Sequence, residues 1–378
     1  MLYKVHCLNK ISPVGLSRFP KDYEIVDSLQ EDVDVILVRS ATMHEMELPN
    51  FVSAVARAGA GVNNIPLDKF ASKGIVVFNT PGANANAVKE LVIAMMLLAA
   101  RDIRGSMEWV KANKEDPEIN KTMEKAKSAF AGTEILGKTL GVIGLGAIGS
   151  LVADSASKLG MKVIGVEPSE ATIKRNAALL GNVEIVDYDE LYKRSDYISI
   201  HVPLLDATRG MLNKDAFNKM KDGVIIINAA RDALVNDDDL KEALESKKVR
   251  RYVTDFPNAK TANMEGVVAI SHLGASTEEA EDNCASMAVD QIVNYINNGN
   301  IVNSVNYPNL SLGKKTGKRA VILCKQENLA KMIEAVKPHL RGECVSGVKG
   351  NYAALIADVN DCFEELKKVG GYITLRVF

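Results

Sequence analysis

The stretch that decides the fold is Leu140-Gly141-Val142-Ile143-Gly144-Leu145-Gly146-Ala147-Ile148-Gly149-Ser150. An apolar run ends in Gly-x-Gly-x-x-Gly and then becomes amphipathic, which predicts a strand, a tight turn and the start of a helix. Gly144 permits the sharp turn, Gly146 lets a pyrophosphate approach the backbone, and Gly149 lets the helix pack closely against the strand. The start of that helix, at Ala147 and Ile148, favours negative charge. The stretch therefore predicts a dinucleotide-binding fold.

The next predicted strand supplies an acid where a dinucleotide cofactor needs one. One helix length after the glycine motif, the apolar run Met161–Val166 ends at Glu167. A carboxylate at this strand end accepts hydrogen bonds from both hydroxyls of the adenosine ribose and repels a 2′-phosphate. The alternative for Glu167 is a solvated carboxylate at a strand end. Together with the glycine motif, Glu167 predicts NAD rather than NADP as the cofactor.

Length and composition indicate a globular protein of two or three domains. The chain has 378 residues, of which 47% are hydrophobic and 25% charged, and its formal net charge is −2. This balance gives no general attraction to nucleic acid or to a membrane surface, and the most apolar stretch, residues 91–100, is too short to span a bilayer. The cysteines lack metal-ligand spacing, so we expect no metal site and reduced thiols in the cytoplasm. They are Cys7, Cys284, Cys324, Cys344 and Cys362.

The predicted strands and helices divide the chain into three parts. Residues 1–100 alternate strands with helices, which predicts a parallel sheet, and residues 287–312 return to complete this domain. Residues 101–286 form the dinucleotide-binding domain, and their first part, 101–138, predicts a helix and an exposed arm. Residues 313–378 follow the order βαββαβ, which is typical of a ferredoxin-like domain.

Polar residues and glycines follow the predicted strands of the dinucleotide-binding domain. Ligands of an open α/β sheet bind outside the carboxyl ends of its strands. Several strand ends of this kind are stronger evidence for a dinucleotide site than one glycine motif. They are Gly144, Glu167, His201-Val202-Pro203, Asn228-Ala229-Ala230-Arg231, Asp255 and His272.

Arg231 and His272 are the residues that we expect to act on a substrate. Oxidation of a 2-hydroxy acid by hydride transfer needs a cation that holds the carboxylate and a base that takes the hydroxyl proton. The Arg231 guanidinium can bind a carboxylate in a planar fork, and an imidazole such as that of His272 titrates near physiological pH. Each residue alone would be an ordinary surface charge or polar side chain. Together on one nucleotide-binding sheet, they predict an active site.

These segments resemble the D-2-hydroxyacid dehydrogenase family, most closely its members that oxidise 3-phosphoglycerate. The resemblance covers about residues 1–310 and implies a flavodoxin-like substrate domain, a Rossmann-type NAD domain and a cleft between them. It also implies that the tail is an ACT-like domain, which binds serine or mediates assembly. The matching segments are Arg57–Ile65, Asn79–Gly82, Gly144–Gly149, His201–Leu204 with Thr208, Asn228–Arg231 and His272–Thr277.

The resemblance implies roles for individual residues. Arg231 holds the substrate carboxylate, His272 is the acid/base, and Arg39 with Ser40 contacts a substrate phosphate. Arg39 could otherwise be an ordinary exposed charge. The implied substrate-binding residues are Arg39, Ser40, Ala60, Gly61, Val62, Asn84 and Arg231. The implied NAD-binding residues are Gly144, Gly146, Ala147, Ile148, Gly149, Glu167, His201, Val202, Pro203, Thr208, Asn228, Ala229, Ala230, Asp255, His272 and Gly274.

The resemblance also implies assembly as a homodimer or homotetramer. The arm over residues 101–138, which contains Trp109, would supply the contact between two copies. The alternative is a loose exposed excursion. In the tail, Gln326-Glu327-Asn328-Leu329 stands where effector-binding ACT domains have Pro-Gly, so inhibition by serine is not expected.

The chain departs from the family beside the catalytic histidine. The family has a glutamate three residues after the phenylalanine of its Asp-Val-Phe segment, where it hydrogen-bonds that histidine. Here the segment is Asp255-Phe256-Pro257-Asn258, and the matching position is Ala259. Without this carboxylate the imidazolium of His272 loses a favourable charge, so we expect reduced activity and a pH dependence shifted to lower pH. Asp232 and Ser271 also replace a usual glycine and proline.

Three functions are consistent with these residues. The first is NAD-dependent oxidation of 3-phosphoglycerate to 3-phosphohydroxypyruvate, in the biosynthesis of serine. The second is another reaction of the family, such as hydroxypyruvate or glyoxylate reduction, which Arg39 and the tail disfavour. The third is a weakly active NADH-sensing binding protein, which Ala259 favours slightly.

Restoring the missing carboxylate tests the role of position 259. We expect Ala259→Glu to raise turnover and to move the pH dependence upward, because a carboxylate beside His272 stabilises its charged form. The measurement is kcat against pH for both proteins. Unchanged turnover would mean that another acid already serves His272.

Overall fold

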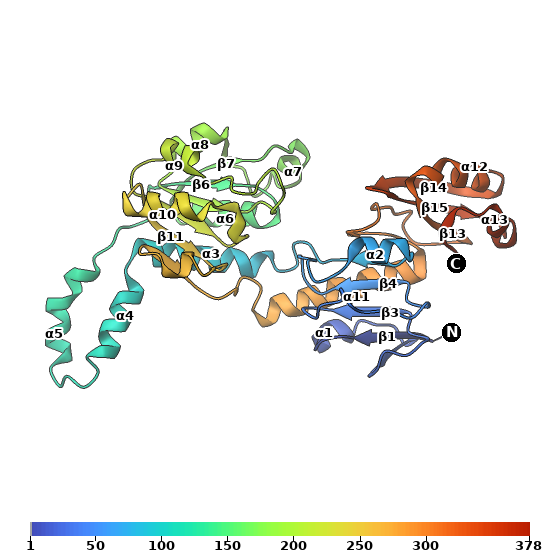
Figure 1. Ribbon diagram of the computed structural model, residues 1–378, viewed down its shortest axis with the longest axis horizontal. Coiled ribbons are helices and arrows are strands. Elements are labelled where there is room, and N and C mark those ends of the chain that lie inside the picture. The colour runs from blue at the N-terminus through green and yellow to red at the C-terminus, as the bar shows by residue number, and fades with distance from the viewer. Residues whose placement is uncertain (1) are drawn as a thin grey trace. The chain divides into compact units, whose positions relative to one another are not determined.

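The computed structural model describes residues 2–378 and divides the chain into two compact units. Unit 1 comprises the chain up to Asn84 together with Glu278–Phe378, and unit 2 comprises Ala85–Thr277. Each unit is described by itself below. Figure 1 shows both units and labels many of their elements.

Unit 1 contains a parallel sheet in the strand order β2-β1-β3-β4-β5. Its central strands are buried because helix α11 (Glu278–Asn298) packs on one face of the sheet, with Ala288, Ile292 and Tyr295 in the same core as Leu37 and Phe78. The chain thus returns to unit 1 after unit 2. The other elements are β1 (Tyr3–Cys7), α1 (Pro13–Leu16), β2 (Tyr23–Val26), β3 (Val35–Val38), β4 (Ala54–Arg57), α2 (Leu67–Ser72) and β5 (Val76–Phe78).

The C-terminal part of unit 1 has the expected order βαββαβ and forms an antiparallel sheet, β14-β15-β13-β16. Alternate residues of its inner strands face opposite sides: Ile322 packs with α12 and α13, whereas Val321 and Leu323 join the core of the parallel sheet and α11. Both faces of the inner strands β13 and β15 are therefore buried. Its elements are β13 (Arg319–Lys325), α12 (Leu329–Val336), β14 (Leu340–Lys349), β15 (Tyr352–Val359), α13 (Phe363–Val369) and β16 (Tyr372–Val377).

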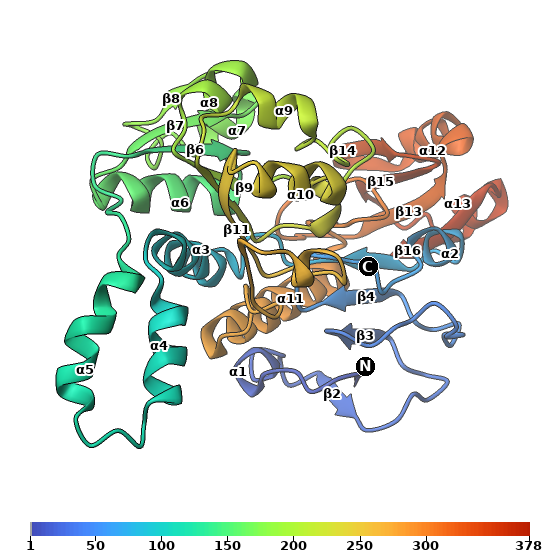
Figure 2. The same cartoon turned by 60° about the vertical axis from the view of Figure 1, so that its left-hand side comes forward.

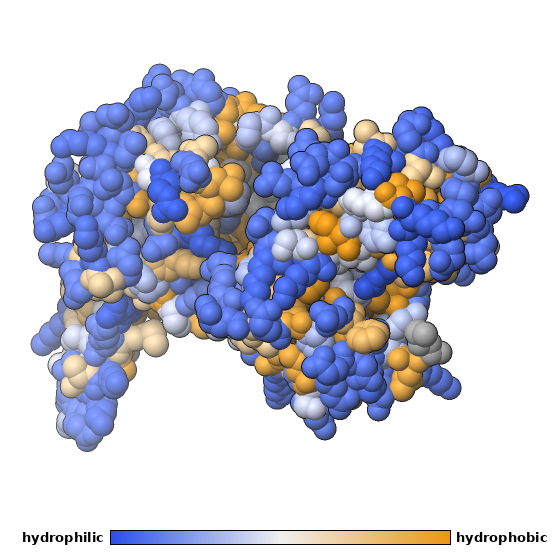
Figure 3. Space-filling view, turned by 45° about the vertical axis from the view of Figure 1, so that its right-hand side comes forward, coloured by the Kyte–Doolittle hydropathy of each residue, from blue (hydrophilic) through white to orange (hydrophobic). Residues whose placement is uncertain are grey.

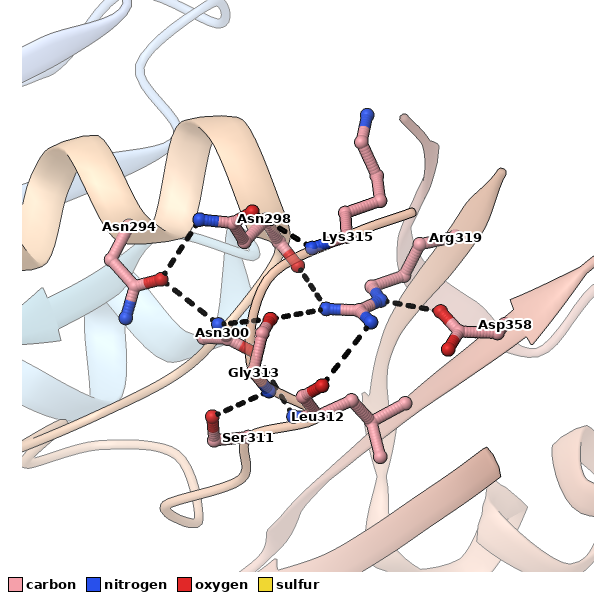
Figure 4. Close-up of polar contacts among 9 residues, drawn as sticks. All are labelled: Asn294, Asn298, Asn300, Ser311, Leu312, Gly313, Lys315, Arg319 and Asp358. Carbon is pink, nitrogen blue, oxygen red and sulfur yellow. Dashed lines mark hydrogen bonds and ion pairs between the residues drawn. The ribbon is translucent and has the colours of Figure 1, made fainter. Parts of the chain in front are cut away.

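A buried arginine joins this antiparallel sheet to the end of α11 (Figure 4). Arg319 is 1% exposed, and its Nε donates to Asp358 Oδ1 at 2.7 Å. Its Nη1 donates to the carbonyls of Asn298 and Gly313, each at 2.9 Å. Asn298 is the last residue of α11. A desolvated guanidinium is tolerated here because its donors have partners from the helix end, the linker and β15.

Unit 2 is built on a parallel sheet in the order β12-β11-β10-β9-β6-β7-β8. Alternate residues face opposite layers: Ile225 and Ile227 pack with α3 and α6, whereas Val224 and Ile226 pack with α8, α9 and α10. Its strands are β6 (Thr139–Ile143), β7 (Lys162–Val166), β8 (Glu184–Ile185), β9 (Tyr197–Ile200), β10 (Val224–Asn228), β11 (Val249–Thr254) and β12 (Val267–Ala269). Its helices are α3 (Ala85–Ala100), α4 (Ile103–Ala112), α5 (Ile119–Ala126), α6 (Ala147–Lys158), α7 (Glu170–Arg175), α8 (Tyr188–Arg194), α9 (Lys214–Lys219) and α10 (Asp237–Glu245).

The sheet of unit 2 has a topological switch point between β6 and β9. From β6 the chain proceeds outward through β7 and β8, and it then returns to place β9 on the other side of β6. The connections therefore diverge at the carboxyl ends of these two neighbouring strands. In open α/β sheets this is where a dinucleotide binds.

Helices α4 and α5 form a hairpin that extends away from the sheet of unit 2 (Figures 1 and 2). Of the residues in these two helices, all of which the structure describes, none is buried. The hairpin corresponds to the helix and exposed arm predicted over residues 101–138.

The two units differ from the sequence-based boundaries at both ends of unit 2. Helix α3, which the sequence places in the first domain, packs against α6, β10 and β11 through Val92, Met95 and Met96. Helix α11 belongs to unit 1 from Glu278, rather than from residue 287. The apolar face of each helix decides its unit, and sequence periodicity does not reveal which sheet that face covers.

The surface shows no extended apolar region in the view of Figure 3, where hydrophobic residues form small scattered patches. Within residues 2–378, none of the helices combines the length and apolarity that crossing a membrane requires.

The Arg319 contacts predict how unit 1 responds to substitution. We expect Arg319→Met to lower the free energy of unfolding by about 3 kcal/mol, because it leaves several buried acceptors without a donor. Lys318→Met is the matched control, since Lys318 is half exposed and pairs with the exposed Asp361. Urea unfolding should show a loss of less than about 1 kcal/mol for the control. Equal losses in both variants would contradict the structural role of Arg319.

Candidate active site

The turn after β6 has the geometry that the glycine motif predicts. Gly144 has φ +89°, and a Cβ there would lie 2.8 Å from the carbonyl oxygen of His201, which follows β9. A Cβ on Gly149 would lie 1.9 Å from the carbonyl oxygen of Gly144, so the start of α6 is pressed against the turn. A Cβ on Gly146 would meet no atom of residues 2–378 within 4 Å. Gly144 and Gly149 are therefore required by the fold, whereas Gly146 faces open space.

The N-terminus of α6 opens toward that space. Gly146 is its N-cap, and within residues 2–378 no side chain caps this end. The first amides of a helix have no carbonyl partner within the helix, so the amides after Gly146 are available to an anion. This arrangement fits a pyrophosphate.

Glu167 lies beside the same turn at the end of β7. Its Oε2 accepts from the backbone N–H of Leu145, and its Oε1 accepts from that of Ser169, both at 3.0 Å. The carboxylate is thus held next to the glycine turn, where the adenosine ribose of a bound dinucleotide lies.

The segment after β9 is ordered by internal contacts. Nε2 of His201 lies 2.8 Å from Ser199 Oγ. Burial of the imidazole lowers its pKa to about 4, so the ring is neutral at physiological pH. Thr208 Oγ1 donates to the carbonyl of Pro203 at 2.6 Å and accepts from the N–H of Leu205 at 2.8 Å. These side chains shape the loop, and Val202 packs near Gly144.

Asn228 fixes the turn that carries Arg231. Its Oδ1 accepts from the N–H of Ala230 at 3.0 Å, and its Nδ2 donates to the carbonyl of Arg231 at 2.8 Å. The same Nδ2 donates to the hydroxyl of Tyr252 at 2.9 Å, a contact that the sequence analysis missed. Ala229 and Ala230 lie within this turn.

Arg231 and His272, the predicted catalytic residues, contact one aromatic ring. The guanidinium carbon of Arg231 lies 5.0 Å from the centre of the Phe256 ring. The ring centres of Phe256 and His272 are 4.2 Å apart, with an angle of 44° between their planes. The structure therefore brings the expected carboxylate-binding and proton-transferring groups together, with Phe256 as their shared support. The sequence analysis did not predict this role for Phe256. Its position directly after Asp255, at the end of a predicted strand, is the signal that could have identified it.

The carboxyl group of Asp255 interacts with the charges of His272 and Arg231, and one of its oxygens has no hydrogen-bond partner among residues 2–378. Its Oδ2 accepts from the N–H of Gly274 at 3.2 Å, while its buried Oδ1 has no partner among residues 2–378. Burial raises the pKa of Asp255, and the charges of His272 and Arg231 partly offset that rise. An unpaired buried acceptor fits an amide donor such as the nicotinamide carboxamide. Ala259 is exposed in the loop that follows.

The substrate residues expected in unit 1 follow three neighbouring parallel strands. Arg39 and Ser40 follow β3, residues 60–62 follow β4, and Asn84 follows β5, so all lie along one edge of the sheet. Asn9 Oδ1 accepts from the N–H groups of Arg39, Ser40 and Ala41, each at 3.0 Å.

Three residues at this edge were not found from the sequence. They are Asn9, Arg57, whose Nε donates to the carbonyl of Arg39 at 3.0 Å, and Glu281, whose Oε1 lies 2.6 Å from Arg39 Nη2. All three depend on contacts between distant parts of the chain.

Within residues 2–378 no group of histidine, cysteine and carboxylate side chains is arranged to hold a metal ion. The glycine turn, the acid at the end of β7, Arg231 and His272 follow strands of the same sheet. They define an NAD-dependent oxidoreductase.

Comparison with known proteins gives the family. Residues 93–274 match the model of the D-isomer specific 2-hydroxyacid dehydrogenase, NAD binding domain. The hydroxypyruvate reductase of Thermotoga maritima is 40% identical over 69% of this chain and 84% of its own length. The D-3-phosphoglycerate dehydrogenase of Methanocaldococcus jannaschii is 34% identical over 82% of this chain and 59% of its own length. The chain belongs to the D-isomer specific 2-hydroxyacid dehydrogenase family.

A solved structure agrees with this assignment. The NAD+-bound 3-phosphoglycerate dehydrogenase of Entamoeba histolytica is 25% identical, covers 81% of this chain and 99% of its own, and has a TM-score of 0.62. The chain spans between 56% and 64% of the lengths of three relatives named D-3-phosphoglycerate dehydrogenase, that of Methanocaldococcus jannaschii among them.

The two glycines of the turn predict opposite outcomes on substitution. We expect Gly149→Ala to lower the melting temperature, because its Cβ would overlap the carbonyl of Gly144 at a cost of about 1–3 kcal/mol. Gly146→Val should stay folded but weaken NADH binding at least about tenfold, because its side chain would occupy the space before the helix N-terminus. Thermal unfolding and NADH fluorescence titration measure both effects. Unchanged NADH affinity in Gly146→Val would contradict this placement of the pyrophosphate.

Proposed function

We propose that the protein oxidises 3-phosphoglycerate to 3-phosphohydroxypyruvate with NAD+, the first step of serine biosynthesis. The observation that carries the proposal is the shared contact of Arg231 and His272 with Phe256, on the sheet edge that holds the glycine turn. Arg39 and Ser40 support a phosphorylated substrate, because they offer a guanidinium and a hydroxyl at the edge of unit 1. Several relatives named D-3-phosphoglycerate dehydrogenase support it as well.

The proposed mechanism uses residues of unit 2. Arg231 binds the substrate carboxylate in a planar fork, which fixes C2 and its hydroxyl. When bound, NAD+ would supply the acceptor for the hydride of C2. His272 takes the hydroxyl proton as the carbonyl forms, and Phe256 keeps its ring beside Arg231. Burial raises the pKa of Asp255 and the charge of His272 lowers it, so the two groups attract each other when both are charged, and a glutamate at position 259 would add to that attraction.

A second candidate is hydroxypyruvate or glyoxylate reduction. The hydroxypyruvate reductase of Thermotoga maritima is 40% identical to this chain, and Arg39 is already paired with Glu281. A third candidate, an NADH-sensing binding protein, draws support from Ala259 alone.

We further propose that the hairpin of α4 and α5 joins two copies in a homodimer or homotetramer. Its apolar side chains Ile103, Met107, Val110 and Met123 are between 41% and 67% exposed. Such side chains favour burial against a partner. We propose an ACT-like role in assembly for the C-terminal antiparallel sheet.

Substrate comparison tests the proposed function. NADH oxidation is measured with 3-phosphohydroxypyruvate, hydroxypyruvate, pyruvate and 2-oxoglutarate in turn. We expect the highest kcat/KM with the phosphorylated acid. A higher value with an unphosphorylated acid would establish the second candidate, and NADH binding without turnover of any acid would establish the third.

Removal of the carboxylate-binding cation tests the mechanism. We expect Arg231→Gln to lower kcat/KM at least about 100-fold, because charge-assisted hydrogen bonds to the carboxylate are lost. Arg175→Gln is the control, since Arg175 is an exposed arginine of α7 in the same unit. NADH affinity is measured in parallel to confirm that the cofactor site is intact. A loss of less than about threefold for Arg231→Gln would contradict its role.

A further inference from the structure

Arg39, the proposed phosphate contact, is already paired with a carboxylate of its own unit. Glu281 stands near the start of α11, and its Oε1 lies 2.6 Å from Arg39 Nη2. The two side chains are 40% and 42% exposed, so the pair is open to solvent and to a ligand. An ion pair of this exposure contributes little to stability, and a stronger anion can displace it.

The surroundings of the pair form a small charged group at the edge of the parallel sheet. Arg57 approaches Arg39 closely, because its Nε donates to the carbonyl of Arg39 and its Nη1 to that of Gly61. Beneath them lies the buried thiol of Cys284, whose pKa is raised by burial and responds to the charges of Arg57, Arg39 and Glu281. Arg39, Arg57 and Glu281 thus lie close together at this edge of the sheet.

The backbone N–H groups after β3 are already hydrogen-bonded, so an anion at this edge must be bound by side chains. The N–H groups of Arg39, Ser40 and Ala41 all donate to Asn9 Oδ1. A phosphate at this place is therefore bound by side chains, of which the Arg39 guanidinium carries the positive charge and is held by Glu281. A carboxylate and a phosphate compete for the same donors because both accept from a guanidinium in a planar fork.

We propose that Glu281 is a specificity-determining residue, which competes with the substrate's phosphate for Arg39 and so limits the preference for phosphorylated 2-oxo acids. The proposal rests on the proposed function, since it concerns the same substrate site. A phosphorylated substrate must displace Glu281 and then carries its own negative charge beside that carboxylate. An unphosphorylated acid brings no charge to this place and leaves the pair intact.

The same helix offers a matched control. Asp290 of α11 accepts a bidentate contact from Arg18: Nε donates to Oδ1 at 2.8 Å, and Nη2 donates to Oδ2 at 2.7 Å. These side chains are 49% and 52% exposed, which is similar to the Arg39–Glu281 pair. Asp290→Asn removes a carboxylate from the same helix and weakens an arginine contact that has no part in the proposed phosphate site. A merely structural role for Glu281 predicts the same outcome for both variants.

The test compares two substrates in three proteins. The kcat/KM values for 3-phosphohydroxypyruvate and hydroxypyruvate are measured at saturating NADH for the wild type, Glu281→Gln and Asp290→Asn. We expect Glu281→Gln to shift the ratio of the two values about fivefold toward the phosphorylated acid, which is the effect of about 1 kcal/mol. Asp290→Asn should leave the ratio as it is in the wild type. An unchanged ratio in Glu281→Gln, or an equal shift in both variants, would overturn the proposal.

The outcomes separate this proposal from the proposed function. A wild type that reduces only the unphosphorylated acid would refute the proposed function, whereas phosphorylated-acid reduction gained by Glu281→Gln would still support competition for Arg39. If the wild type reduces neither acid, calorimetry of 3-phosphoglycerate binding to the NADH-loaded proteins replaces the assay. Tighter binding in Glu281→Gln than in the other two proteins would then support the proposal, and equal binding would overturn it.

Discussion

The close approach of α6 to the turn after β6 is the constraint on which the nucleotide-binding unit depends. The carbonyl of Gly144 occupies the place that a Cβ of Gly149 would need, and the carbonyl of His201 does the same for Gly144. The start of α6, the turn and the segment after β9 therefore meet closely through backbone carbonyls, with the Val202 side chain beside Gly144. Because the connections diverge at this point, the amides of α6 and the carboxylate of Glu167 face the space left by Gly146. Backbone packing thus leaves open space at the N-terminus of α6, which fits a pyrophosphate.

The reactive groups are held by contacts that are themselves buried. Asn228 binds the turn that precedes Arg231 and is tied to Tyr252, while Asp255 holds the amide of Gly274 close to His272. Phe256 then lies against both the guanidinium and the imidazole. This support matters because transfer of a hydride and a proton requires the substrate's carboxylate, its C2 atom and the base to be held in a fixed relative geometry. It also gives His272 a defined neighbour although position 259 carries no acid.

Much of this arrangement was predictable from the sequence, and the reasons are physical. Buried parallel strands leave apolar runs in the sequence, and the polar residues after them mark one sheet edge, which is why the sequence predicts Glu167, Arg231 and His272 as site residues. The contacts of Asn9 with the segment after β3 and of Glu281 with Arg39 join residues far apart in the chain, and no local pattern announces them. Helix α3 was assigned to the other domain because its apolar face is equally suited to either sheet. The Arg319 contacts depend in the same way on how the tail meets α11.

Transfer of an isotope tests most directly whether these groups act together on a 2-oxo acid. The protein is incubated with 3-phosphohydroxypyruvate and NADH that carries deuterium at the transferred position of C4, and the product is analysed by mass spectrometry. The account predicts 3-phosphoglycerate with one deuterium at C2, because the hydride passes directly from the cofactor to the carbon that Arg231 and His272 position. Product without deuterium, or bound NADH that yields no product, would contradict it.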